Sequence, residues 1–317
     1  MNIKFSNSYA IAVLAIAVVF SVSISAQTKK AGSPAALRVV TIESQPNATV
    51  WLDGVRYGKT GSDGELTIKT VVAGTHTIRV RADGYKETQQ PLLPTQKGTV
   101  KIDLTKTTDE AELAFQEAER LISSDREKSV AAYRKAIKAR SNYPEAYLAL
   151  ARVLLDSGDG EEAEKAIVQA RKLRPAYAEA SAVEGRIQKE IGEEDKAIAA
   201  FKRAITEGKG LQPEAYTGLG LLYKEKAETS GASGDFEGEN ANYAESSKYL
   251  KTALKQLSGA SDAVIIYQLL GLIYERQKNY AAAIALYEEF LQIFPDTTEA
   301  TAVRSFIIQL KKDMESP

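Results

Sequence analysis

The stretch PEAYLALARVLLDSGDGEEAEKAIVQARKLRPAY, from Pro144 to Tyr177, decides the fold of this chain. Apolar residues recur in it every three or four positions, at Tyr147, Leu150, Ala151, Leu154, Ala163, Ile167 and Ala170. This period is that of an amphipathic α-helix. Gly158 divides the pattern and Pro175 ends it, so the stretch predicts two helices joined in a hairpin.

The same pattern recurs along the chain, and its first three steps are close to 34 residues. Further copies begin near Glu110, Ala178, Pro213 and Val264. One hairpin cannot bury both of its apolar sides, whereas stacked copies can. Over residues 110–297 the copies resemble tetratricopeptide repeats, with Gly185, Gly220 and Gly271 at the positions where two helices touch. The resemblance implies an all-α solenoid of about five hairpins that holds partners.

Three departures from a regular array are visible. The copy at Glu110 fits only when one residue is dropped from its turn. The copy at Pro213 carries an insertion at residues 228–241, whose Gly, Ser, Asn and acidic residues predict an exposed loop that extends the flanking helices. This insertion is either neutral or a binding loop. Residues 298–314 predict one more helix, which caps the array with the apolar residues Ala302, Phe306, Ile307 and Leu310.

Residues 37–106 follow a different pattern, in which apolar and polar residues alternate. The alternating apolar positions are Val40, Ile42, Val50, Leu52, Leu66, Ile68, Ile78, Val80, Val100, Ile102 and Leu104. Alternation of this kind predicts half-buried β-strands. Four turn dipeptides fall between them, at residues 53–54, 63–64, 73–74 and 83–84, each ending in the glycine that a tight turn requires. The pattern predicts a small antiparallel β-sandwich.

Three segments of this module carry a family resemblance. QPNATVWLDG (residues 45–54), AGTHTIRV (73–80) and DGY (83–85) resemble a PEGA domain, although the name-giving tetrapeptide reads PNAT at residues 46–49. Carboxypeptidase-regulatory-like sandwiches have nearly the same VxLDG, AGxHxIxV and GY segments, so both families stay open. The resemblance implies a non-enzymatic module of exported, envelope-associated proteins.

The first residues predict export. Lys4 lies in a short basic region, an apolar run extends over residues 10–20, and Ser23, Ser25 and Ala26 follow it. This order is typical of a secretory signal that is cleaved near Ala26. The alternative is an uncleaved membrane anchor, although the run is shorter than the ~20 residues that span a bilayer. The chain has no cysteine, which excludes a lipid-modified cysteine, disulfides and thiolate metal sites.

Composition and charge exclude further classes of function. The 317 residues carry a net charge of −1, but residues 27–107 have 12 basic and 7 acidic side chains while residues 108–317 have 28 and 35. These opposite signs either attract partners or arise by chance. A concentrated basic stripe is missing, so no nucleic-acid partner is expected. His76, the single histidine, is expected to pack in a strand, and no hydrolase, metalloprotease or calcium motif is present. We therefore expect no enzyme, metal or cofactor; an enzyme with carboxylates from separate repeats is the alternative.

The resemblance to tetratricopeptide repeats also implies where a partner binds. The first helices of such hairpins line the concave surface, and the residues that flank their packed stripe are Leu148, Arg152, Val183, Arg186, Lys189, Leu221, Lys224, Leu272 and Arg276. Recurring cations beside leucines favour an acidic or carboxylate-ended segment. The alternative is that the cations pair with Glu179, Glu190, Glu225 and Glu275 on the same helices.

Two aromatic residues of the β module form a second candidate contact. Trp51 is out of phase with the apolar Val50 and Leu52, so its ring is expected to face outward, and Tyr57 follows in the next segment. An exposed ring of this kind stacks on a sugar or a partner. The alternative is that these rings pack against the helical part.

The sequence thus predicts a multidomain chain. Its segments are a signal peptide (1–26), a linker (27–36), the β-sandwich (37–106), the repeat array (108–297) and a capping helix (298–314). The expected function is that of an exported scaffold whose repeats bind a peptide or protein segment and whose sandwich places it at the cell envelope. In the alternative, the sandwich of an envelope-associated structural or glycan-binding protein does the binding and the repeats are a spacer. Membrane attachment is expected only if the signal stays uncleaved.

Overall fold

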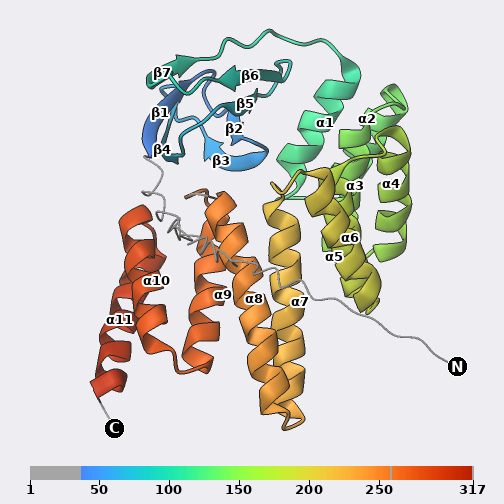
Figure 1. The fold of residues 1–317 in the computed structure, drawn as a ribbon. Coiled ribbons are helices and arrows are strands. Elements are labelled where there is room, and N and C mark those ends of the chain that lie inside the picture. Colours follow the sequence, from blue (N-terminus) through green and yellow to red (C-terminus); the bar gives the residue numbers. More distant parts are fainter. Residues whose placement is uncertain (1–36, 258, 316–317) are drawn as a thin grey trace, which may run out of the picture. The chain divides into compact units, whose positions relative to one another are not determined.

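A computed structural model describes residues 37–257 and 259–315 of the chain (Figure 1). The predicted signal peptide and linker, residues 1–36, lie outside the described residues.

Two small sheets form the amino-terminal module. The first has the order β4–β1–β7, from β4 (Glu65–Val71), β1 (Arg38–Glu43) and β7 (Gly98–Lys101). The second has the order β3–β2–β5–β6, from β3 (Val55–Lys59), β2 (Thr49–Leu52), β5 (His76–Arg81) and β6 (Thr88–Leu92). The predicted antiparallel pairing holds except between β1 and β7, which are parallel because the chain crosses from the second sheet back to the first after β6.

The alternating residues form the core of this sandwich as predicted. Val40, Ile42, Val50, Ile78 and Val80 have no exposed surface. The turn at residues 53–54 joins β2 to β3 with φ of 50° and 82°, the left-handed backbone that Asp-Gly dipeptides favour. Strands β3 and β6 were not predicted, because VRYGK and TQQPL lack the apolar alternation of the other strands.

Ten helices form the five predicted hairpins. They are α1 and α2 (Glu110–Leu121, Arg126–Ala139), α3 and α4 (Pro144–Asp156, Gly160–Leu173), α5 and α6 (Ala178–Glu190, Glu194–Glu207), α7 and α8 (Pro213–Ala232, Phe236–Leu257), and α9 and α10 (Ala263–Arg276, Tyr280–Ile293). The second helix of each hairpin contacts the first helix of the next one. The degenerate first copy is a hairpin too, with Ala118, Ser129 and Tyr133 buried.

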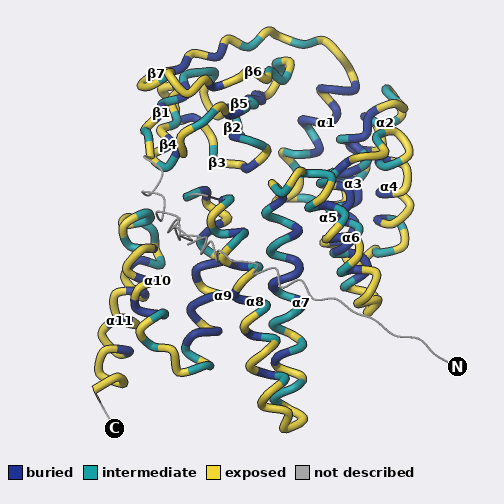
Figure 2. The backbone as a smooth tube through the Cα atoms, in the orientation of Figure 1, coloured by how far each residue is buried: buried dark blue, intermediate teal, exposed yellow. Residues whose placement is uncertain are grey.

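Glycines allow the two helices of a hairpin to approach closely. A Cβ atom added to Gly185 would lie 2.6 Å from the ring of Phe201, and one added to Gly220 would lie 2.6 Å from Leu250. Gly271 faces Tyr287 in the same way. The paired positions are 16 residues apart in two of these hairpins but 30 apart at Gly220, where the 14-residue insertion intervenes. Figure 2 shows buried residues along the inner sides of these helices.

The insertion is helical, so the predicted loop at residues 228–241 is wrong. Helix α7 continues to Ala232 and α8 begins at Phe236, which leaves a turn of three residues. Packing explains the difference, because Tyr243 of the extended α8 is buried and Glu239 Oε1 accepts a hydrogen bond of 3.0 Å from Arg276 Nε of α9. The expected extension of the flanking helices is confirmed.

The capping helix is α11 (Glu299–Glu315), and its packed face differs from the prediction. Its buried residues are Ala300, Val303, Ile307 and Leu310. Ala302 and Phe306 were expected on that face but are exposed, because the helix is rotated so that Val303 faces α10. The ring of Phe306 lies 6.2 Å from that of Tyr287.

The β-sandwich contacts the first helix of the array. The amide nitrogen of Gln116 in α1 donates to the carbonyl of Tyr85 at 2.8 Å, and its amide oxygen accepts from the N–H of Gly84 at 2.8 Å. Arg81 of β5 pairs with Glu119 of α1, with 2.7 Å between Nη1 and Oε1. The two modules therefore share polar contacts beyond their covalent joint.

Candidate functional site

Ion pairs join the first helices of three hairpins, α3, α5 and α7, along one face. Asp156 of α3 accepts a hydrogen bond of 2.8 Å from Arg186 of α5. Arg186 also lies 3.6 Å from Glu214 of α7, and Glu214 accepts a hydrogen bond from Arg152 of α3. We call the surface formed by the outward sides of α3, α5, α7 and α9 the first-helix face.

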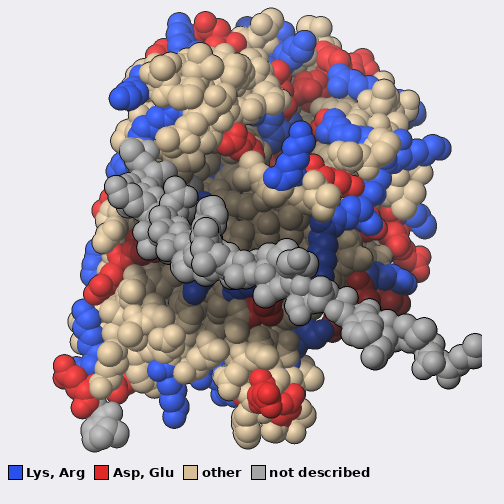
Figure 3. Space-filling model, in the orientation of Figure 1, with Lys and Arg blue, Asp and Glu red and all other residues tan. Residues whose placement is uncertain are grey.

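The remaining predicted cations are paired as well. Lys189 Nζ of α5 lies 2.7 Å from Glu225 Oε1 of α7, and Lys224 Nζ lies 2.6 Å from Glu228 Oε1. Among the described residues, each of the five predicted cations thus has a carboxylate partner, including Arg276 with Glu239. The strip of unpaired cations is therefore not found in the part of the chain that the structure describes. Where charged side chains gather in Figure 3, mainly toward the top and the right, Lys and Arg are mixed with Asp and Glu.

The alternative set of partners was also largely wrong. Of the four glutamates expected to pair on the same helix, only Glu225 pairs with one of these cations, and it does so across two helices. Most partners lie 30 or more residues away in the sequence, as Glu214 does from Arg152. Same-helix spacing therefore could not find them.

Burial and charge act against each other at Arg152. Its side chain is 40% exposed. Burial of the guanidinium group is the largest single effect and would lower its pKa, but the attraction of Glu214, Tyr177 and Glu179, together with the hydrogen bond to Glu214, outweighs it and raises the pKa of Arg152. An acidic partner would compete with Glu214 for this arginine.

The apolar residues of the predicted face divide into buried and exposed ones. Leu148 and Val183 are buried in the core, so their assignment to a partner-binding surface is wrong. They point inward because α3 and α5 are packed on two sides. Leu221 is half-buried, whereas Leu272 of α9 is 57% exposed.

One exposed residue of this face was missed. Ile265 of α9 is 52% exposed and lies seven positions before Leu272, which places both on the same side of the helix two turns apart. The sequence signal was present, because Ile265 is part of the apolar run Val264–Tyr267 that exceeds what one packed stripe requires. Helix α9 thus presents two large apolar side chains to solvent.

Trp51 and Tyr57 do not form an open aromatic surface. Trp51 is half-buried between the buried Val50 and Leu52, and the guanidinium carbon of Arg79 lies 4.1 Å above its ring. Tyr57 packs against the sandwich core and against apolar residues of the later helices. Arg79 thus occupies one face of the indole ring that a sugar would stack on.

The remaining polar features give structural roles. His76 is 8% exposed at the start of β5, and its ring nitrogens lie 2.6 Å from Asp53 Oδ2 and 2.9 Å from the carbonyl of Val72. This packing agrees with the strand position predicted for it. Within residues 37–257 and 259–315, no group of three or more His, Asp or Glu is placed to hold a metal ion. In the same ranges, each helix is too short or too polar to cross a membrane.

Family comparisons identify both modules. The model of the PEGA domain matches residues 37–108, which decides between the two sandwich families. The model of a tetratricopeptide repeat matches residues 121–170, 148–215 and 234–297, which together cover just over half of the chain. No curated protein sequence matches the chain.

Solved structures are similar to this chain at low identity. A crystal structure of MamA is 22% identical with a TM-score of 0.40, covering 59% of this chain and 93% of that one. Yeast Tom70 is 16% identical with a TM-score of 0.51, covering 66% of this chain and 41% of that one. A human IFIT1 dimer with m7Gppp-AAAA is 19% identical with a TM-score of 0.48, covering 57% and 41%. The likeness to Tom70 supports the repeat fold and no more.

Proposed function

Because the chain belongs to the tetratricopeptide-repeat family and carries a PEGA domain ahead of its repeats, we propose that it is an exported, non-enzymatic protein-interaction scaffold. Its first-helix face binds a segment of a partner protein. The PEGA domain places the array at the cell envelope.

The exposed pair on α9 is the observation that carries this proposal. Ile265 and Leu272 are each more than half exposed, although the other apolar residues of α9 pack into the array. Burying one such side chain against a partner is worth about 1.5–3 kcal/mol. Two of them, two turns apart on one helix, suit a partner segment that presents its own apolar residues.

Electrostatic recognition has less support than apolar contact. Arg152 and Arg186 already share Asp156 and Glu214, and an exposed ion pair contributes only about 0–1 kcal/mol. An acidic segment would gain little from an exchange of one carboxylate for another. We therefore infer that the partner is recognised chiefly by apolar contact. The competing hypothesis is an acidic partner that binds the cations.

Two variants of the full chain separate these readings. The chain is immobilised and exposed to envelope extract, and captured proteins are quantified by mass spectrometry. Leu272→Glu should remove the specific partner, and Phe236→Glu is the control, because Phe236 is 67% exposed but belongs to the second helix α8. The double variant Arg152→Gln and Arg186→Gln should leave capture unchanged.

The outcomes decide between the modes of binding. Loss of the partner with the glutamine variants but not with Leu272→Glu would favour an acidic partner. Equal loss with Leu272→Glu and Phe236→Glu would contradict a site on the first-helix face. Thermal melting of each variant must match the parent within a few degrees.

Export is part of the proposal and rests on the sequence pattern of residues 1–26. Amino-terminal sequencing of the protein recovered from the envelope fraction should give a start near Gln27. Recovery of the protein only from the cytosol, with Met1 retained, would contradict it.

A further inference from the structure

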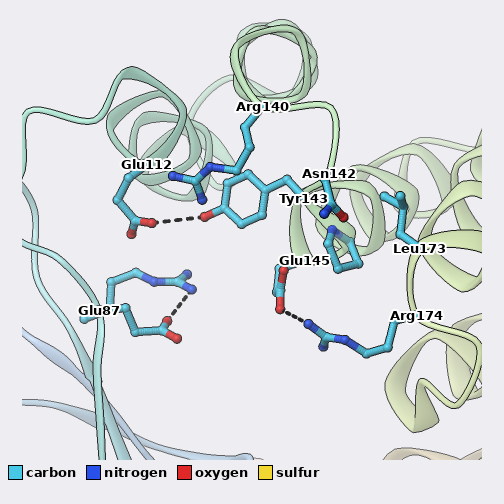
Figure 4. A pocket seen from close by; sticks show the side chains of 10 residues that line it. Glu87, Glu112, Arg140, Asn142, Tyr143, Glu145, Leu173 and Arg174 are labelled. Carbon is cyan, nitrogen blue, oxygen red and sulfur yellow. Dashed lines mark hydrogen bonds and ion pairs between the residues drawn. The ribbon is translucent and has the colours of Figure 1, made fainter.

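A polar cavity of about 450 Å³ lies where the β-sandwich meets the first two hairpins. Figure 4 shows the side chains that line this junction cavity. They are Arg81, Glu87, Glu112, Arg140, Asn142, Tyr143, Pro144, Glu145, Leu173 and Arg174. The volume is within the ~300–1,000 Å³ of small-ligand sites. No residue proposed for partner binding on the first-helix face lines it.

The charges that line the cavity are balanced. Three guanidinium groups, those of Arg81, Arg140 and Arg174, face three carboxylates, those of Glu87, Glu112 and Glu145. Neither a simple anion nor a simple cation is favoured by such a lining. A ligand that carries one charge of each sign matches it.

Two arginines of the lining have donors that suit a carboxylate. The guanidinium carbon of Arg140 lies 4.6 Å from the ring centre of Tyr143, and that of Arg174 lies 4.3 Å from that of Tyr177, so both groups are held by stacking. Arg140 donates to Asp109 and Arg174 donates to Glu145, each through one nitrogen. A guanidinium group has five N–H donors, so further donors remain for a ligand.

The start of α3 also suits a carboxylate. Pro144 and Glu145 are its first residues and line the cavity, and its N-cap residue Tyr143 makes no side-chain capping bond. The amino-terminal end of a helix carries about half a positive charge and attracts carboxylates.

Two carboxylates of the lining suit an ammonium group. In Figure 4, Glu87 and Glu112 lie on the side of the cavity away from Arg174, with Glu87 paired to Arg81 and the guanidinium group of Arg140 beside Glu112. Glu112 accepts hydrogen bonds from the Tyr143 hydroxyl at 3.1 Å and from Gln116 at 3.0 Å, and a carboxylate has about four acceptor positions. Acceptor capacity therefore remains on this side.

Arg81 shows that the cavity is an organised polar site. Its side chain is only 8% exposed, and its guanidinium carbon lies 4.5 Å from the ring centre of Phe115. Among the described residues, its Nε atom is buried and has no hydrogen-bond partner. Buried donors without a partner are rare and point to a missing acceptor.

We propose that the junction cavity binds a small zwitterion, namely a free amino acid or a short peptide with both of its charged ends. The ligand carboxylate contacts Arg174 and the start of α3. The ligand ammonium group contacts Glu87 and Glu112. The β-sandwich and the repeats each supply part of this site, which gives the PEGA domain a second role beside placement of the array.

The test uses the full chain and the dipeptide L-alanyl-L-alanine, with binding measured by isothermal titration calorimetry. N-acetyl-alanyl-alanine lacks the ammonium group and alanyl-alanine amide lacks the carboxylate. Each analogue should bind at least about tenfold more weakly than the dipeptide, the change expected for loss of one contact worth ~1.4 kcal/mol. Glycine, the smallest zwitterion, should bind and should compete with the dipeptide.

Variants assign the binding to this cavity. Arg174→Gln and Glu112→Gln should each weaken dipeptide binding about tenfold or more. The matched control is Arg134→Gln, because Arg134 lies on α2, pairs with Glu162 and does not line the cavity. Circular dichroism checks that each variant is folded.

The analogues test the proposal even if a variant fails to fold. Equal binding of the dipeptide and its acetylated form would overturn it in favour of an anion site. No binding of either zwitterion at 10 mM, or unchanged binding by both cavity variants, would also overturn it.

Discussion

A methyl group added to Gly271 should destabilise the last hairpin. Gly271 lies on α9 against Tyr287 of α10, and a Cβ atom there would lie 2.6 Å from Cε1 of the tyrosine ring and closer still to its Cζ and Oη. Tyr287 is 5% exposed, and its hydroxyl donates to Glu275 Oε1 at 2.7 Å. The ring cannot give way without disturbing both the core and this hydrogen bond.

The size of the effect follows from three contributions. Overpacking of a close-packed core costs about 1–3 kcal/mol. Weakening the hydrogen bond to the half-buried Glu275 lowers the free energy of unfolding by about 1 kcal/mol more. Alanine in place of glycine inside a helix raises it by about 1 kcal/mol. The net loss for Gly271→Ala is therefore about 2 kcal/mol, which lowers the melting temperature of an array of this size by roughly 4–8 °C.

Thermal and urea unfolding followed by circular dichroism measure this loss. The matched control is Gly160→Ala, because a Cβ atom at Gly160 would make only an ordinary contact of 4.0 Å with Ile191. The control should melt at or slightly above the parent temperature. If Gly271→Ala and Gly160→Ala melt together, close contact at Gly271 does not hold the hairpin and the reasoning fails.

Two further perturbations test the electrostatics of the array. Burial, helped by nearby carboxylates, raises the pKa values of Tyr133, Tyr143 and Tyr177 above the usual value of about 10. Their neutral forms therefore stabilise the fold fully below pH 10, and this stabilisation is lost as the pH rises further. The urea midpoint should fall between pH 9 and pH 11, and it should fall less in Tyr133→Phe; an equal fall would contradict this assignment. Arg81→Leu leaves Glu119 without its partner and should cost about 2 kcal/mol, below the 3–5 of a fully buried pair because Glu119 is 35% exposed.

The repeat fold could be predicted because each copy restates the same packing rule. The contacts of Gly185 with Phe201 and Gly271 with Tyr287 follow from one alignment of the copies. At Gly220 the partner is Leu250, which the same alignment gives once the insertion is removed. A pattern that recurs four or five times carries more information than any single helix.

Composition alone misread the insertion. A loop was expected because the Gly, Ser, Asn and acidic residues of the insertion offer little to a core, and Gly231 and Gly238 each disfavour a helix by about 1 kcal/mol. Contacts made elsewhere outweigh this cost, since Tyr243 is buried and Asp235 caps the start of α8 by accepting from the N–H of Gly238 at 2.9 Å. Propensity is a local property, and tertiary packing decided the outcome.

The prediction of unpaired cations on the binding face failed for a related reason. Sequence spacing identifies which residues lie on the outward side of a helix, but it does not reveal charges on the neighbouring helix. The partner of Arg152 is 62 residues away, and the partner of Arg276 lies 37 residues before it, at the far end of an extended helix. Of the apolar residues predicted on that face, only Leu272 is well exposed. Leu148 and Val183 are buried because their helices are packed from both sides.

The joint between the modules shows what this means for cooperativity. The switch from period two to period 3.6 near residues 106–109 predicts two units that unfold separately, with cleavage by proteases between them. The structure instead joins them through Arg81 with Glu119 and through Gln116 with the chain at Gly84, contacts that a change of period cannot reveal. We therefore expect the sandwich and α1 of the parent chain to unfold together, in one transition. In Arg81→Leu, the sandwich should unfold in a transition separate from that of the array. Two well-separated transitions in the parent, unchanged by Arg81→Leu, would show that these contacts do not couple the modules.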